Sequence, residues 1–539
     1  MTTHAQAKPG LRAGPKEWLG LAVLALPTLL LSLDVTVLFL ALPHLSADLG
    51  ANSTESLWIM DIYGFMIAGF LITMGTLGDR IGRRRLLIAG GTAFGIASVL
   101  AAYSTSPEML IATRALLGIA GATLMPSTLS LITNMFLDAK QRGLAIGVWV
   151  SCFSLGIAIG PVVGGVMLES FWWGSVFLLA VPVMALLLVL GPILLPESRD
   201  AEAGRIDIAS VLLSLAAMIP LIYGIKELAK HGLSGAAIAT LIIGVAFAAV
   251  FAVRQRRLEN PLLDLRLFSN RSFTVALTVL LLGLVTIGGI YLFVTQYLQL
   301  VADLSPLETG LWLLPAALAM TAASMMAPGL AQRLRPSVVV GVSLFISAVG
   351  FFILTQADAA SGLAVVVTGF AVLYFGTGPM MALGTDLVVG SAPPEKAGSA
   401  SAMSETAMEM GVALGVAALG SVGAAVYQSQ INGSVPAGTP EAAAAAAEDS
   451  LASASAEAAN MSEGAATALL EPAREAFTSA LNVVGGISAV VIALLAVLAL
   501  VALRNIGGGE EPGAEAEADA PVETPAPAGD PLVAAQQSS

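Results

Sequence analysis

Long apolar runs separated by short polar segments dominate the chain. Each run holds roughly twenty residues, the length that a helix needs to cross the hydrocarbon core of a bilayer. Charge, proline or glycine bounds every run. The pattern predicts an all-α polytopic membrane protein with 14 transmembrane helices. The approximate runs are 18–42, 57–78, 85–103, 109–133, 143–168, 174–195, 208–228, 235–253, 273–300, 307–331, 337–355, 362–391, 397–427 and 482–503.

The first run follows Lys8, Arg12 and Lys16 and superficially resembles a signal peptide. It is too long for the apolar region of such a peptide and lacks a small-residue cleavage site. We therefore interpret it as an uncleaved first helix.

Basic residues orient the runs. Of the 24 Lys and Arg, all but Arg114, Lys226, Lys230 and Arg474 fall in segments on one side of the membrane. Positive residues favour the cytoplasmic side, and an even number of spans places both termini together. The split predicts a multi-pass protein of the inner (plasma) membrane with both termini in the cytoplasm.

Composition narrows the function classes. The chain is 57% hydrophobic and only 11% charged, about half the charge of a soluble protein. One cysteine, Cys152, and three scattered histidines give no disulfide and no metal site, and we expect no cofactor. The sequence shows no nucleophile with a nearby base, as an enzyme would need. It also has no GxxxxGK[ST] phosphate loop for ATP, so an ion gradient must supply the energy for any transport.

Two loops suggest an internal duplication, since Leu77–Gly82 and Leu330–Arg335 are faintly similar. Two halves around a midplane cavity are typical of secondary transporters. The 428–481 loop could form one or two Ala-rich helices or stay flexible. The predicted domains are a cytoplasmic segment 1–17, a six-helix bundle 18–195, two inserted helices 208–253, a second six-helix bundle 273–503 with an extracytoplasmic loop 428–481, and a disordered acidic cytoplasmic tail 504–539.

Arg114 is the one basic residue away from the ends of a run, where a lone arginine costs at least ~2.5–3.5 kcal/mol and needs a partner. Asp34 lies well inside the first run. A carboxylate there is expensive to ionise, which suits a group that alternately holds and releases a proton. A purely structural ion pair is the alternative for Arg114.

Further acids lie within runs. Glu405 and Glu409 are four residues apart and share a helix face, so double ionisation is disfavoured and a proton or a lipophilic cation could satisfy them. Asp61 opens the second run and could be a solvated helix-start acid. Asp386 lies near the cytoplasmic end of its run and could be only an entrance acid.

Glycines and charges mark two further strings. In the first cytoplasmic loop, an acid at a helix end among arginines could form a breakable latch, or simply a basic topology determinant with a turn. Glycines four apart in the fifth run make a groove for tight helix packing, and a proline permits a bend. The latch residues are Gly75, Asp79, Arg80, Gly82 and Arg83. The fifth-run residues are Gly156, Gly160, Pro161, Gly164 and Gly165.

Aromatic residues inside the runs could line a cavity, because a cation over a ring gains ~0.5–2 kcal/mol. Most such rings merely pack. The candidates, together with Met66, are Trp58, Tyr63, Trp149, Phe153, Tyr291, Tyr297 and Tyr374.

Four of these strings, in the right order, resemble the major facilitator superfamily and its fourteen-helix drug:proton antiporters, the quaternary-ammonium and multidrug exporters. They are Leu33–Pro43, Gly75–Arg85, Arg114–Gly121 and Gly156–Gly165. The resemblance implies proton-coupled export by alternating access. It implies proton coupling at Asp34, Arg114 and Glu405, and substrate contact at Asp61, Glu405 and Glu409. The fifth-run string marks exporters within the superfamily.

Two departures limit the resemblance. The run Pro315–Thr321 carries no acid, which puts bulky dications in doubt, and Gln332 replaces the acid of the second latch. The expected partners are lipophilic or cationic drugs, protons and the bilayer, with no nucleic acid and no required protein. A narrow exporter of one antibiotic or metabolite, a lipid flippase and, with the 428–481 segment as a sensor, a receptor remain alternatives.

Overall fold

The computed structural model describes residues 12–198, 207–231, 234–258, 261, 263–392, 397–436 and 438–503. Within them every regular element is a helix, joined to the next by turns and short irregular segments. The predicted tail 504–539 and most of the segment 1–17 lie outside the described residues.

The first set of helices covers the N-terminal part of the chain. It consists of α1 (Pro15–Leu49), α2 (Ser53–Ile81), α3 (Arg83–Ala102), α4 (Pro107–Met135), α5 (Ala139–Ser170), α6 (Ser175–Leu178) and α7 (Ala180–Leu194).

Two helices follow, α8 (Ile208–His231) and α9 (Gly235–Arg257). The remaining elements are η1 (Leu265–Ser269), α10 (Arg271–Gln296), η2 (Tyr297–Val301), α11 (Pro306–Ala331), α12 (Pro336–Leu354), α13 (Leu363–Gly390), α14 (Ala397–Ile431), α15 (Glu441–Asp449), α16 (Leu451–Ala458) and α17 (Glu463–Ala502).

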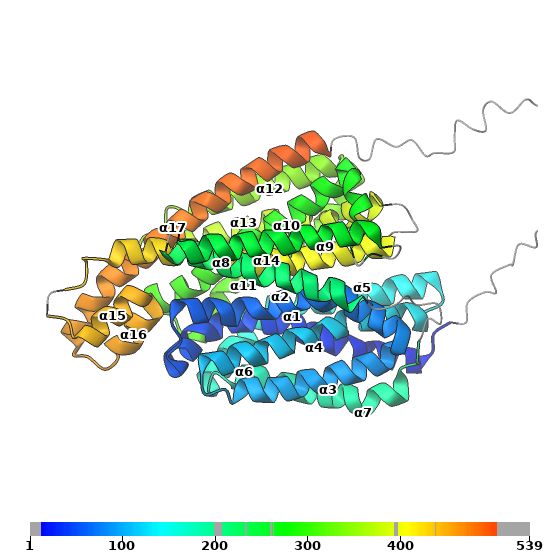
Figure 1. Cartoon of the computed structure of the whole chain (residues 1–539), viewed down its shortest axis with the longest axis horizontal. Coiled ribbons are helices and arrows are strands. Elements are labelled where there is room, and N and C mark those ends of the chain that lie inside the picture. The colour runs from blue at the N-terminus through cyan, green and yellow to red at the C-terminus, as the bar shows by residue number, and fades with distance from the viewer. Residues whose placement is uncertain are drawn as a thin grey trace, which may run out of the picture.

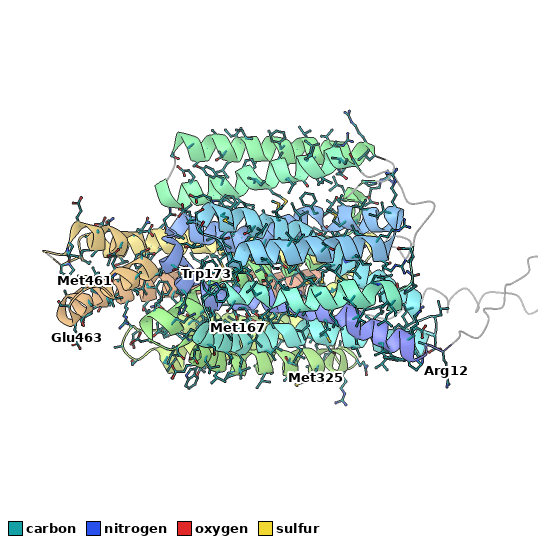
Figure 2. All side chains as sticks on the ribbon, turned by 90° about the horizontal axis from the view of Figure 1, so that it is seen from below. Arg12, Met167, Trp173, Met325, Met461 and Glu463 are labelled. Atoms are coloured by element: carbon teal, nitrogen blue, oxygen red, sulfur yellow. The ribbon has the colours of Figure 1, made fainter. Side chains whose placement is uncertain are left out.

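Thirteen helical spans over the described residues are long and apolar enough to cross a membrane. α2, with 29 residues, also exceeds the ~20 that a crossing needs. Together they match the fourteen predicted spans. Large apolar side chains face outward, and Met325, labelled in Figure 2, is 78% exposed. Such a surface suits lipid, so the all-α, multi-pass prediction is confirmed.

Polar side chains fix where the helices begin. The Asn52 side chain accepts from the Glu55 backbone N–H at 2.9 Å, and the Glu55 carboxylate accepts from the Asn52 backbone N–H, which caps α2. Asp138 caps α5 and Ser234 caps α9 through the same kind of bond. These caps satisfy backbone donors that would otherwise be unpaired at the helix starts.

α1 lies at the centre of the N-terminal set, with most of its residues buried against α4, α5, α7 and α10. α8 packs on the line between α2 and α14, where Phe65, Ile222 and Ala417 form a small separate core. Figure 1 shows α1 to α7 on one side of the molecule and α10 to α14 and α17 on the other, while α8 packs on α2 and α14 and α9 packs on α8.

The two ends of the molecule differ. α15 and α16 lie together at one end, where Met461 and Glu463 are labelled, and Arg12 lies at the opposite end (Figures 1 and 2). We call these the hairpin end and the Arg12 end. The 428–481 segment is thus helical in α15 and α16, and α17 begins at Glu463, 19 residues before the predicted span of 482–503.

Candidate functional site

Arg114 and Asp34 form an ion pair in the interior of the N-terminal helices. The Arg114 Nη1 atom donates to Asp34 Oδ2 at 2.8 Å, from α4 to α1. Arg114 is 1% exposed, and its Nε also donates to the Ile59 carbonyl at 3.3 Å. The arginine thus has the acidic partner that its place in a membrane span demands.

Aromatic rings surround the guanidinium of this pair. The Arg114 Cζ atom lies 4.3 Å from the centre of the Tyr63 ring and 6.0 Å from that of Phe177. A desolvated cation over such a ring gains further stabilisation. Tyr63, singled out as a possible cavity residue, therefore lies against the ion pair, and Phe177 was not singled out.

Asp61 lies two residues before Tyr63 on α2. The helix begins at Ser53, so Asp61 is more than two turns inside and does not open it, which corrects the predicted start. The residue is 0% exposed. Burial rules out the solvated-acid alternative. Trp58, one turn away, packs against the Phe65–Ala417 core beside α8.

Glu405 and Glu409 both lie on α14, and their side chains keep partial exposure. α2 packs directly against this part of α14, since a Cβ on Gly64 would lie 3.0 Å from Ala413 Cβ and 3.7 Å from the Glu409 carbonyl. The glutamates therefore stand next to the helix that carries Asp61 and Tyr63. Asp386, the secondary candidate, is exposed four residues before the end of α13.

Trp149 and Phe153 lie on α5. The Trp149 indole N–H donates to Thr128 Oγ1 of α4 at 3.2 Å, and the side chain is 7% exposed. Trp149 thus joins α4 to α5, while Phe153 is partly exposed.

The glycines of α5 seat two neighbouring helices. A Cβ on Gly156 would lie 2.4 Å from the Leu29 carbonyl, and one on Gly160 would lie 1.9 Å from Thr36 Oγ1. On the next turn a Cβ on Gly165 would lie 2.6 Å from Leu307 Cα of α11. Gly164 likewise faces Val37, and Gly310 of α11 approaches the Pro161 carbonyl. The glycines of this string therefore allow α1 to pack closely on one side of α5 and α11 on the other.

The predicted latch gains a partner that the sequence did not reveal. The Arg84 backbone N–H donates to Glu197 Oε1 at 3.1 Å, and the side-chain Nε atoms of Arg84 and Arg85 lie 3.6 and 3.7 Å from Glu197 Oε2. Gly82 has a φ of 113°, and a Cβ there would lie 2.4 Å from Glu197 Oε1. Glycine is needed both for this backbone and for this approach.

Two of the other latch residues face α4 instead. Arg83 is 9% exposed, and its Nη1 approaches the Pro126 carbonyl of α4 at 3.5 Å. Arg80 is exposed, and Gly75 faces Pro126. The side chain of Asp79 lies outside what the structure describes. The sequence did carry a signal for Glu197, because this acid directly follows α7 and lies on the same predicted side of the membrane as the basic loop.

Four rings link the two sets of helices toward the hairpin end. Phe39 of α1 meets Tyr291 of α10 edge to face at 4.7 Å between centroids. Tyr291 lies 5.8 Å from Phe370 and 6.4 Å from Tyr374. Tyr297 instead donates to the Asp358 carbonyl at 2.5 Å. The rings close this part of the interface between α1 and α10.

In the described part of the chain, no three His, Cys, Asp or Glu side chains gather closely enough to hold a metal ion.

Comparison with known proteins identifies the family. The sequence model of the Major Facilitator Superfamily matches residues 24–416. The chain is 44% identical over 507 residues to the multidrug efflux pump LfrA of Mycolicibacterium smegmatis, covering 94% of this chain and 100% of that protein. It is 35% identical to the methyl viologen resistance protein SmvA of Salmonella typhimurium, covering 86% of this chain and 93% of that protein. It is 33% identical to the puromycin resistance protein pur8 of Streptomyces alboniger, over 79% and 86%.

Solved structures share the fold at low identity. A bacterial homolog of the human lysosomal transporter Spinster, inward-facing and unoccupied, aligns with a TM-score of 0.61 at 16% identity, over 91% of this chain and 99% of that one. A peptide transporter in complex with sulfate aligns with a TM-score of 0.60 at 17% identity, over 90% and 95%. The membership predicted from the four strings is confirmed: the chain belongs to the Major Facilitator Superfamily.

Proposed function

We propose that this protein is a proton-coupled antiporter that exports lipophilic, mainly cationic drugs by alternating access. The observation that carries the proposal is the 2.8 Å ion pair between Arg114 and Asp34, buried inside a membrane span. Protonation of Asp34 would remove its charge and leave Arg114 uncompensated, so the pair must rearrange. That rearrangement gives the proton a means of driving a conformational change.

The drug site in this proposal lies on the other set of helices. Glu405 and Glu409 share a face of α14 and keep partial exposure, so a lipophilic cation can reach them. A bound cation satisfies one or both carboxylates, and a proton satisfies them equally well. Competition between the two explains exchange. Relatives named as multidrug efflux and methyl viologen resistance proteins support this substrate class.

The membrane orientation in this mechanism follows the distribution of basic residues. Both termini lie in the cytoplasm of a plasma-membrane protein, and the hairpin end lies outside. The helices of 18–195 and 273–503 are the two moving bundles, and 208–253 is the insert between them. Contacts between Gly165 and Leu307 and between Phe39 and Tyr291 close the hairpin end. No protein partner enters this mechanism.

The test uses inside-out membrane vesicles energised by a proton gradient, with ethidium uptake as the readout. Wild-type vesicles should accumulate ethidium, an uncoupler should abolish uptake, and Asp34→Asn should accumulate none. Glu169→Gln, a carboxylate exposed near the end of α5, is the matched control and should behave as wild type.

The other outcomes decide between alternatives. Uptake that survives in Asp34→Asn would remove the ion pair from the coupling mechanism. No uptake by folded wild-type protein would favour a narrow exporter, a role suggested by the puromycin resistance relative. The same vesicles assayed with puromycin would then test that role.

A further inference from the structure

A cavity of about 260 Å³ lies at the hairpin end, between segments that are far apart in the sequence. Its walls come from η2 and the turn after it, from α16 and from α17, and α16 packs against α17 at this end of the molecule (Figure 1). The polar and larger apolar residues that line it are Gln299, Leu300, Asp303, Ser455, Leu470 and Arg474. None of them belongs to the proposed proton or drug sites, so the cavity is a separate feature of the fold.

Arg474 supplies the positive charge of this cavity. Its Nε atom donates to the Leu300 carbonyl at 2.9 Å, which holds the guanidinium against η2. Nη2 lies 3.8 Å from Asp303 Oδ1, which is beyond hydrogen-bonding distance. Neither Nη atom donates a hydrogen bond to another of the described residues. The two Nη groups therefore keep the planar fork of donors that recognises a carboxylate or a phosphate.

Gln299 adds an amide to the same wall. Its side chain is 7% exposed, and among the described residues neither Oε1 nor Nε2 has a hydrogen-bond partner. A buried amide without a partner is costly, so a ligand that accepts from Nε2 would remove part of that cost. Gln299 also lies in a π-helical turn, Tyr297–Val301, a rare geometry that is frequent at functional sites.

We propose that this cavity binds a small oxyanion, a phosphate or a carboxylate, with the Arg474 Nη groups and the Gln299 amide as its donors. In the proposed orientation the cavity faces the outside. It would there meet dissolved anions and the phosphate headgroups of the outer leaflet, which present the same oxygen atoms. The inference does not depend on which drug is transported.

Asp303 competes with such a ligand for the arginine. Its side chain is 85% exposed and is held to Arg474 only by the 3.8 Å approach, so an incoming oxyanion can take its place. Exposed ion pairs of this kind contribute little stability. Asp303→Asn should therefore tighten the binding of an anion, whereas it would weaken the binding of a cation in the same cavity.

The test uses purified full-length protein and two sources of oxyanion. Inorganic phosphate and acetate would be titrated into delipidated protein in a nonionic detergent at constant ionic strength, with the Tm as the readout. In a second arm, the protein would be placed in phosphatidylcholine nanodiscs with or without phosphatidylglycerol. The variants are Arg474→Gln, Gln299→Leu and Asp303→Asn, and Gln430→Leu, an exposed amide on α14, is the matched control.

We expect an oxyanion to raise the Tm of the wild type by at least about 1 °C, because a ligand that binds only the folded state stabilises it. The response should vanish in Arg474→Gln and need at least about tenfold more ligand in Gln299→Leu. Asp303→Asn should respond at a severalfold lower concentration, and Gln430→Leu should match the wild type. A response to phosphate or acetate in detergent assigns the site to free anions, and one confined to phosphatidylglycerol assigns it to a lipid headgroup.

The proposal is overturned if neither the dissolved anions nor phosphatidylglycerol raises the Tm of the wild type, or if Arg474→Gln responds equally. Arg474→Gln also loses the bond to Leu300, so a fall in its own Tm without ligand would be a separate, structural effect. Should that variant not fold, Asp303→Asn decides, because its exposed side chain can be replaced without disturbing the core. An unchanged or weaker anion response in Asp303→Asn would contradict the proposed site.

Discussion

A buried charge constrains every residue around it. Arg114 has a carboxylate, a backbone carbonyl and two aromatic rings within reach, which together replace the water that it lacks. The acids on α14 are arranged differently, because they are partly exposed and lie one helical turn apart. The first cluster is thus compensated by its neighbours, whereas the second places two acids of like charge on one helix face.

This difference predicts different mutant phenotypes. Glu405→Gln should narrow the range of cations transported and raise their KM severalfold, while neutral substrates should be carried nearly as before. Asp34→Asn should stop the transport of all substrates. A substrate panel measured in the same vesicles checks both. Equal losses for cations and neutral compounds in Glu405→Gln would place this residue in proton coupling alone.

The sequence predicted which buried residues need a partner better than it predicted the pairings themselves. Arg114 demanded an acidic partner, and Asp34 was singled out as a costly acid, yet their pairing depends on how α1 and α4 are aligned. Glu197 was missed because it lies far along the chain from Arg84. Asp61 looked like a helix-start acid because the polar cap at Asn52 extends α2 beyond its apolar run.

At the scale of the helices, close packing decides where the two sets meet. The α5 string places small residues against α1 and α11, and the Gly165 approach to Leu307 lies on the closed side of the molecule. The resemblance to a known family implied that this string is typical of exporters. Only the packing shows that the string contacts both helix sets.

Gly165→Ala should push α11 away from α5, because the added Cβ would lie 2.6 Å from backbone and no rotamer can relieve the clash. We expect transport to fall at least about fivefold. Gly147→Ala, on the same helix with nothing within 4 Å of its Cβ, should transport as wild type. Ethidium uptake at matched expression measures both, and equal activities would show that α5 and α11 tolerate separation at this position.

A second helix-scale prediction concerns the inserted pair. Arg254 donates to Asp207 at 2.8 and 3.2 Å, and this hydrogen bond holds the pKa of Asp207 below its usual value. A carboxyl whose pKa is lowered by folding stabilises the folded state at pH values above its ordinary pKa. This contribution is lost as the pH falls through the lowered pKa.

Asp207→Asn should therefore lower the Tm by no more than about 2 °C near neutral pH, because the pair is partly exposed. The difference from wild type should stay constant down to about pH 5 and vanish in stronger acid. Thermal melting across that range measures it. A difference that grows on acidification would contradict a lowered pKa at Asp207.

At the scale of the whole molecule, the hairpin end is the part whose structure the sequence did not decide between helices and a flexible loop. α15 and α16 dock across both helix sets. Asp449 accepts from the Ser53 backbone N–H at 3.1 Å and from its hydroxyl at 3.2 Å, while the Tyr427 hydroxyl donates to the Ala447 carbonyl at 2.7 Å. Alanine-rich composition allowed helices in this segment, but only these long-range contacts place them.

Asp449→Ala should loosen this closure. A cysteine at Ser46, now 6% exposed beside the docked segment, should react faster with a membrane-impermeant thiol reagent in that variant, in a Cys152→Ser background. Glu441→Ala, at the exposed start of α15, should leave the labelling rate unchanged. Equal labelling rates in all three proteins would show that the Asp449 contact does not hold the hairpin end closed.

The central claim, that proton binding at the Asp34–Arg114 pair drives drug export, is tested most directly by measuring both fluxes in one proteoliposome. An imposed ethidium gradient should drive opposite proton movement in the wild type, reported by an internal pH dye, and should drive none in Asp34→Asn although ethidium still binds. Proton movement of wild-type size in folded Asp34→Asn, or drug transport by the wild type without any proton movement, would contradict the account.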